Sequence, residues 1–132
     1  MGRRFIDVNV QKFYATQTLK WCKKFLGSNP RKKKPIKLSV LKRTRKEDDK
    51  TDCGSYHSDE NRIIIYYLNC PTIKDVVSTV IHEYTHYLQS NKKYFEFMEH
   101  YYYSSHPYEK EARKNEEKYS NKCIRHIRKY LY

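Results

Sequence analysis

The segment TIKDVVSTVIHEYTHYLQ, residues 72–89, decides the fold. Its start signal is complete, because Thr72 can accept a hydrogen bond from a free backbone amide while Asp75 bonds back to the cap. Seven apolar residues follow at the spacing of one helical face: Ile73, Val76, Val77, Val80, Ile81, Tyr84 and Leu88. A helix with so broad an apolar face must pack against the rest of the protein. We therefore predict a buried helix that begins at Thr72.

Two further helices are predicted on either side of this segment. Apolar and aromatic residues recur at mostly helical spacing over residues 9–26, and Gly27 is a good C-terminal stop. Near the other end of the sequence, Pro107 suits a first helical position and the pattern runs to about Tyr130. The buried stripe of this last helix comprises Ala112, Tyr119, Cys123, Ile124, Ile127 and Leu131.

Between the first and second helices the pattern changes to that of strands. Residues 36–41 alternate apolar and polar side chains, which is the period of a half-buried strand. A short extended piece around Tyr56 and a β-branched, aromatic run over 62–68 flank the turn-forming residues 58–61, which predicts a hairpin. We predict an α+β fold with a small mixed or antiparallel sheet of about three strands. At 132 residues, the chain is expected to form a single domain.

The net charge of +13 is concentrated in residues 1–50, which carry a net charge of +12, whereas residues 51–132 carry +1. The basic residues are most concentrated in residues 29–35, where they lie between two prolines. This pattern predicts an exposed connection between elements. Such a run can attract nucleic-acid phosphates or an acidic partner, or it can simply solvate a loop. The side chains available for such binding are Arg31, Lys32, Lys33 and Lys34.

Several patterns bear on where the protein works. The longest apolar run, residues 63–68, is far shorter than the roughly 20 residues that a bilayer requires. The first ten residues lack the apolar stretch of a secretory signal, so we expect a soluble cytoplasmic or intracellular protein without membrane contact. Its four cysteines would then be free thiols, although a secreted or virion-borne chain could form two disulfides. They are Cys22, Cys53, Cys70 and Cys123.

The central helix carries the motif HExxH in His82, Glu83 and His86. Residues four apart on a helix face the same side, so both imidazoles can bind one tetrahedral zinc. Glu83 lies about 100° further around the helix, where it is better placed to bond a zinc-bound water than to bind zinc itself. The spacing therefore predicts a hydrolytic zinc site with Glu83 as the general base.

A catalytic zinc needs a third protein ligand. The metzincin pattern requires a glycine at position 89 and a histidine at position 92, but the chain has Gln89 and Lys92, which excludes that class. The next candidates lie in residues 100–119, where Glu109 and Glu116 share the inward side of the predicted last helix.

The combination of His82-Glu83-x-x-His86 with Glu109-Lys110-Glu111-Ala112 resembles the gluzincin zinc metallopeptidases. The resemblance covers about residues 54–120 and implies a minimal zincin-like catalytic core there, with one Zn²⁺ per chain and Glu109 as the third ligand. The smallest family members are single-domain peptidases encoded by phages and bacteria, so a phage or virus origin is also implied.

The sequence departs from the family pattern at Arg113, where thermolysin-like enzymes have an acidic residue that orients a histidine. Glu116 or a tyrosine is the expected replacement. His100 or His106 as the third ligand would make the protein more similar to SprT-type peptidases, which act on DNA-associated proteins. Glu111 and Glu116 are further alternatives.

The predicted function is that of a zinc metalloendopeptidase acting on a protein or peptide substrate. A tyrosine is expected to stabilise the oxyanion, and the candidates are Tyr94, Tyr101, Tyr102, Tyr103 and Tyr108. In related peptidases an edge strand pairs with the substrate backbone, and that strand resembles Gly54, Ser55 and Tyr56. The alternatives are a basic nucleic-acid-binding module with an incidental HExxH, and a zinc domain that has lost catalysis.

Overall fold

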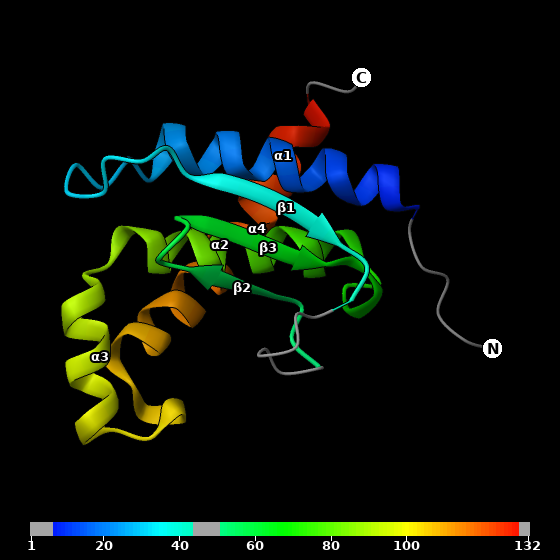
Figure 1. Ribbon diagram of the computed structural model, residues 1–132. Helices are drawn as coiled ribbons and strands as arrows, with labels where there is room; N and C mark the ends of the chain where they lie inside the picture. The colour runs from blue at the N-terminus through cyan, green and yellow to red at the C-terminus, as the bar shows by residue number, and fades with distance from the viewer. Residues whose placement is uncertain (1–6, 44–50, 130–132) are drawn as a thin grey trace.

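The computed structural model describes residues 7–43 and 51–129. Parts of the predicted basic segment 1–50, namely residues 1–6 and 44–50, lie outside the described residues, as do Tyr130 and Leu131 of the predicted last helix. The predicted α+β fold is confirmed, with four α-helices and a three-stranded sheet among the described residues (Figure 1). In chain order the elements are α1 Val8–Phe25, β1 Lys37–Leu41, β2 Gly54–His57, β3 Arg62–Tyr66, the 3₁₀-helix η1 Tyr67–Asn69, α2 Ile73–Leu88, α3 Asn91–His100, the 3₁₀-helix η2 Tyr103–Ser105 and α4 Pro107–Lys129.

The sheet is mixed, with strand order β1-β3-β2. The central strand β3 pairs in parallel with β1 and antiparallel with β2. The predicted hairpin is confirmed, and Asn61 closes its turn with a φ of 49° while accepting a hydrogen bond from the Tyr56 hydroxyl at 2.6 Å. The prediction that the second strand continues to Leu68 is wrong, because residues 67–69 turn into η1. In this strand order the short strand β2 lies at one edge of the sheet.

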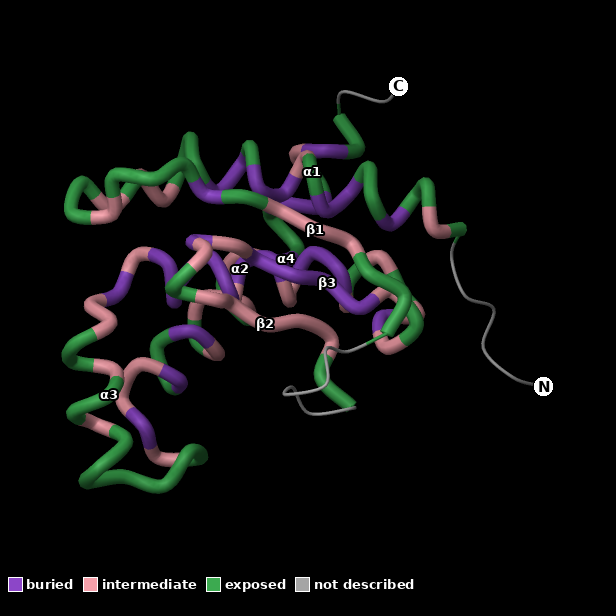
Figure 2. Tube along the Cα trace, in the orientation of Figure 1, coloured by how far each residue is buried: buried purple, intermediate pink, exposed green. Residues whose placement is uncertain are grey.

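The helix α2 is the centre of the packing. It lies between α1 and α4 and also contacts β2 and β3 (Figure 1). The residues of α2 and β3 are mostly buried (Figure 2), and the side chains of Val76, Val77, Val80, Ile81 and Tyr84 are completely so. The apolar face of this segment is therefore the face that packs into the core. This packing fixes the position of α2 and, with it, the positions of His82 and His86.

The predicted ends of the helices agree with the structure. Thr72 Oγ1 accepts a hydrogen bond from the Asp75 amide at 3.1 Å, and Asp75 Oδ2 accepts one from the Thr72 amide at 3.1 Å. This reciprocal pair is the predicted capping box. The helix α1 ends at Phe25, and Gly27 has a φ of 84°, a conformation that favours glycine.

The edge strand β2 lies unusually close to α2, and Gly54 makes that approach feasible. A Cβ atom at position 54 would lie 2.6 Å from the carbonyl oxygen of Ile64 and 2.6 Å from Cγ2 of Thr79. Any side chain there would push β2 away from its neighbours. The absence of a side chain at this position thus keeps the sheet edge beside the HExxH helix.

The helix α3 is an element that the sequence analysis did not predict. Ser90 caps it by accepting a hydrogen bond from the Lys93 amide at 3.3 Å. None of its ten residues is buried, and Phe95 and Met98 are more than half exposed. It extends from the end of α2 and lies beside the start of α4, away from α1 and β1 (Figure 1).

No helix within residues 7–43 and 51–129 has the length and apolar character needed to cross a membrane. The four cysteines are free thiols. Cys53 and Cys70 lie close together, since the Cys53 thiol donates to the carbonyl of Asn69 at 3.1 Å and the Cys70 thiol donates to the carbonyl of Cys53 at 3.2 Å. These bonds connect the start of β2 to the segment that precedes α2.

Candidate metal centre

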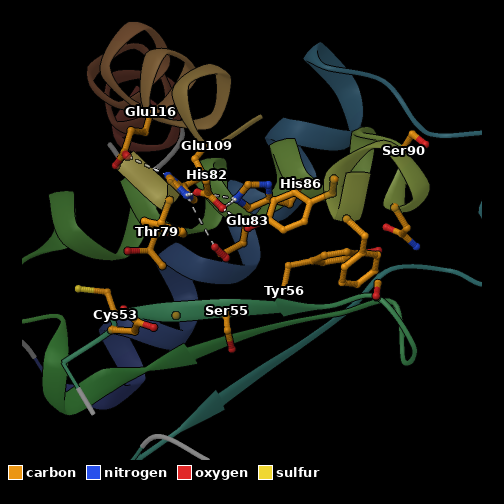
Figure 3. A pocket seen from close by; sticks show the side chains of 17 residues that line it. Cys53, Ser55, Tyr56, Thr79, His82, Glu83, His86, Ser90, Glu109 and Glu116 are labelled. Atoms are coloured by element: carbon orange, nitrogen blue, oxygen red, sulfur yellow. Dashed lines mark hydrogen bonds and ion pairs between the residues drawn. The ribbon is translucent and has the colours of Figure 1, made fainter. Parts of the chain in front are cut away.

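Two histidines and one glutamate converge from two helices. His82 and His86 lie one turn apart on α2, with ring centroids 5.0 Å from each other. Glu109 lies in the first turn of α4 and is 2% exposed. Its carboxylate points toward both imidazole rings (Figure 3). The structure therefore brings together the three residues that were predicted as metal ligands.

Small side chains allow α4 to approach α2 closely. Ala112, one turn after Glu109, is completely buried. Further along the contact, the hydroxyl oxygens of Ser78 and Ser120 lie 2.8 Å apart, and Asn115 donates a hydrogen bond to Thr85 at 3.2 Å. This close contact between the two helices positions Glu109 beside His82 and His86.

The separations of Glu109 from the two histidines are close to those between ligands of a tetrahedral metal site. Glu109 Oε1 lies 3.1 Å from His82 Nε2 and 3.1 Å from His86 Nε2. With metal–ligand bonds of about 2.0–2.1 Å, two ligands of a tetrahedral zinc lie roughly 3.3–3.4 Å apart. Both Glu109–histidine separations are therefore only slightly shorter than those around a bound zinc.

Each of the three side chains is oriented by a further hydrogen bond. Nδ1 of His82 donates to Glu116 Oε1 at 2.9 Å, and Nδ1 of His86 donates to Gln89 Oε1 at 2.7 Å. The second oxygen of Glu109 accepts a hydrogen bond from the Tyr94 hydroxyl at 2.5 Å. Histidine ligands in metal sites are commonly held in this way by a carboxylate or a carbonyl oxygen.

The charges of this cluster favour a cation at its centre. A neutral imidazole that donates from Nδ1 presents a lone pair at Nε2, and here both Nε2 atoms face the Glu109 carboxylate. Burial opposes protonation of His82, but hydrogen bonds to Glu109 and Glu116 outweigh it and raise its pKa to about 10. Burial likewise acts against ionisation of Glu109, but its bonds to His82 and His86 lower its pKa. The donor set fits a metal ion, which would replace those protons.

Glu83 lies beside the three converging side chains. It is 7% exposed, and burial raises its pKa. Its Oε1 is 4.0 Å from His82 Nε2, which is farther than the 3.1 Å that separates His82 from Glu109. Ligand atoms of His82, Glu83 and His86 nevertheless all lie within 4.8 Å of one another, so Glu83 borders the same centre.

A cleft of about 460 Å³ opens over this centre. Its walls come from β2, α2, the start of α3, η2 and α4, and Thr79 lines it next to the HExxH motif (Figure 3). Gly54, Ser55 and Tyr56 line it from the sheet side. Within residues 7–43 and 51–129 no further strand pairs with the outer edge of β2. The predicted edge strand is therefore the edge strand of the described sheet, and it lies beside the candidate metal centre.

The structure separates the tyrosines that the sequence could not distinguish. Tyr94 and Tyr103 line the cleft, and the hydroxyl of Tyr94 donates to Glu109. Tyr103 is 68% exposed, and burial of its hydroxyl together with the nearby Glu109 carboxylate raises its pKa. Tyr108 does not line the cleft, and its ring packs against Phe97. The other two predicted candidates, Tyr101 and Tyr102, are exposed and also lie outside the lining.

The two histidines considered as alternative ligands do not join the centre. His106 is almost fully buried, with Nε2 donating to the carbonyl of Tyr94 at 2.9 Å and Nδ1 accepting from the Tyr108 amide at 3.1 Å. Both of its ring nitrogens are therefore engaged in holding α3 and the start of α4. His100 is exposed at the end of α3.

Two residues, Gln89 and Lys32, were not placed near this centre by the sequence analysis. Gln89 orients His86 and also donates to the carbonyl of Tyr108 at 3.0 Å. The sequence feature that could have indicated this role is the position of Gln89 about one helical turn after His86. Lys32 donates to the Tyr56 hydroxyl at 3.3 Å and to the His86 carbonyl at 3.4 Å. Burial lowers the pKa of Lys32 to about 8.

The predicted basic run is not a uniform exposed surface. Arg31, Lys33 and Lys34 are exposed, but Lys32 is half-buried, with its ammonium 4.9 Å from the ring centroid of Tyr56. Lys32 thus turns inward toward the cleft. Binding of nucleic acid or an acidic partner through the run stays a prediction.

Comparisons of the chain with protein-family models, with curated proteins and with solved structures found no match. The chemistry of the site must therefore be inferred from its own geometry. Its defining features are a His-His-Glu donor set on two packed helices and a buried carboxylate in a cleft bordered by the edge strand β2. The resemblance to gluzincins stays a prediction from the motif.

Proposed function

We propose that this protein is a zinc-dependent metallopeptidase. The observation that carries the proposal is the convergence of His82, His86 and Glu109 at 3.1 Å, with the buried Glu83 beside them. A site of this kind needs three protein ligands, an accessible fourth position and a base, and the cleft gives access to the fourth position. Two imidazoles and a carboxylate are a ligand set of known catalytic zinc sites.

The roles of the side chains follow from their positions. Zinc bound by the three residues would supply a Lewis acid that lowers the pKa of a water molecule to about 7. Glu83 would accept the proton from the attacking water and deliver it to the leaving nitrogen. Its buried environment, which raises its pKa, suits a group that must hold a proton between these two steps.

Substrate binding would use the cleft walls. The strand β2 lies at the edge of the described sheet and lines the cleft, so we expect an extended peptide to bind along it, largely through the main chain. Tyr103 lines the cleft and is the tyrosine whose position best suits donation to the developing oxyanion. Tyr94 would instead position Glu109.

The test is a measurement of metal content and proteolysis on the same preparation. We expect one zinc per chain, cleavage of an unfolded protein substrate, loss of cleavage with a chelator and recovery when zinc is returned. A protein that binds no zinc at micromolar metal, or that binds iron in its place, contradicts the proposal.

The hydrogen bond between His82 and Glu116 gives a separate prediction. In Glu116→Gln the carboxylate no longer polarises His82, so zinc affinity should fall by about 10- to 100-fold. Competition with a chromophoric chelator measures the change. Glu117→Gln, an exposed change one residue further along α4, is the matched control and should match the parent. Equal affinities in all three proteins would show that Glu116 does not tune the site.

A further inference from the structure

We propose that the cleft selects substrates that place a carboxylate at its Tyr56–Ser90 end, where Lys32 and Arg31 bind it. This inference rests on the proposed peptidase function and names the substrate class. Tyr56 and Ser90 lie at the end of the cleft opposite Cys53 and Glu116 (Figure 3). Two cations, Arg31 and Lys32, lie just beyond that end, whereas the lining of the cleft itself carries carboxylates.

A second hollow adjoins the cleft at this end. It has a volume of about 350 Å³ and is lined by Asn29, Arg31, Lys32 and residues 88–91. Ser90 and Asn91 line both spaces, so the hollow continues the cleft beyond Tyr56. A substrate chain that lies along β2 past the metal centre would therefore bring one of its groups into a space with two cations.

The ammonium of Lys32 is held there by neutral groups. Its partners are the Tyr56 hydroxyl at 3.3 Å and the His86 carbonyl at 3.4 Å, and the ring centroids of Tyr56 and Tyr87 lie 4.9 and 5.6 Å away. Within residues 7–43 and 51–129 no carboxylate forms an ion pair with Lys32 or Arg31. A half-buried cation without a counter-charge gains more from an arriving carboxylate than an exposed one does.

The opposite end of the cleft has the opposite charge. Glu116 lies at that end (Figure 3), Asp52, which precedes Cys53 in the chain, also lines the cleft, and Glu83 and Glu109 lie at the centre. A substrate carboxylate would be repelled from that end and attracted to the hollow, so the charges also favour one register of the chain along β2. The carboxylate can come from an acidic side chain or from the C-terminus of a substrate, and both present the same two oxygens.

The experiment compares matched peptides. One set exchanges Glu for Gln at each position around the cleaved bond, and a second set exchanges a C-terminal acid for an amide. We expect kcat/KM to be about tenfold or more higher for the carboxylate at one position, as expected for charged hydrogen bonds. A preference in the first set identifies an acidic side chain as the source of the carboxylate, and a preference in the second set identifies the C-terminus.

Variants assign the preference to residues. In Lys32→Gln and in Arg31→Gln, the ratio of kcat/KM between acidic and neutral peptides should fall toward one. Arg31 is exposed, so Arg31→Gln tests the inference even where Lys32→Gln disturbs the packing on Tyr56. Lys33→Gln is the control, because Lys33 is exposed and does not line the hollow, and it should keep the parent ratio.

A binding measurement separates this inference from the proposed function. The Glu83→Gln variant, with zinc added, is titrated with the same labelled peptides, and tighter binding of the carboxylate form that Arg31→Gln abolishes supports the inference. Equal cleavage and equal binding of acidic and neutral peptides overturn the inference and leave the peptidase intact. Absence of zinc and of all cleavage overturns the peptidase, and the binding titration still decides whether the hollow takes a carboxylate.

Discussion

Glu83→Gln should bind zinc as tightly as the parent protein and should lose nearly all peptide hydrolysis. Glutamine keeps the size of the side chain but cannot accept the proton of the attacking water. Loss of a general base lowers the rate by about 10²- to 10⁴-fold. Zinc should stay because Glu83 lies 4.0 Å from His82 Nε2, outside the set of three side chains that meet at 3.1 Å.

Metal analysis and steady-state kinetics on the same samples check this prediction. Glu99→Gln, a change of the same kind at an exposed position of α3, should keep both zinc and activity. Loss of zinc in Glu83→Gln would make Glu83 a ligand. Full activity with full zinc would exclude Glu83 as the base and with it the proposed mechanism.

Glu109→Ala should lose both zinc and activity. The carboxylate that both imidazoles face disappears, and the Tyr94 hydroxyl loses its acceptor. Removal of a hydrogen-bonded partner of a ligand costs about 10- to 100-fold in metal affinity, and removal of a ligand itself should exceed that range. The two histidines would keep only weak binding.

A zinc titration followed by thermal unfolding tests this second prediction. Zinc should raise the Tm of the parent, because a ligand that binds only the folded state stabilises it, and should barely raise that of Glu109→Ala. Glu117→Ala, an exposed change on the same helix, should respond to zinc as the parent does. Full zinc retention in Glu109→Ala would move the third ligand to another carboxylate, and Glu83 would be the first to examine.

The parts of the fold that the sequence predicted correctly are those with local signals. Thr72 and Asp75 are three residues apart, so the start of α2 is encoded within one turn. The apolar face of α2 and the turn at Asn61 are equally local. The positions of His82 and His86 on one side of α2 follow from helical geometry alone.

The rest depends on contacts between distant segments. Lys32 meets the HExxH helix across 54 residues of sequence, and no periodicity reveals that contact. The helix α3 was missed although it has local signals, namely the capping residue Ser90 and the aromatic residues Tyr94 and Phe97 three positions apart. The choice between Tyr103 and Tyr108 requires knowing where η2 and α4 turn, which no local rule gives.

The exposed character of α3 has a consequence for the energetics of the cleft wall. A helix without fully buried side chains gains less from the hydrophobic effect than α2 does, so α3 depends more on its few polar bonds. Two of the bonds that hold it, from Tyr94 to Glu109 and from His106 to the carbonyl of Tyr94, end on or next to the metal centre. A metal ion that fixes Glu109, as the proposed function requires, would therefore also stabilise this wall of the cleft through Tyr94.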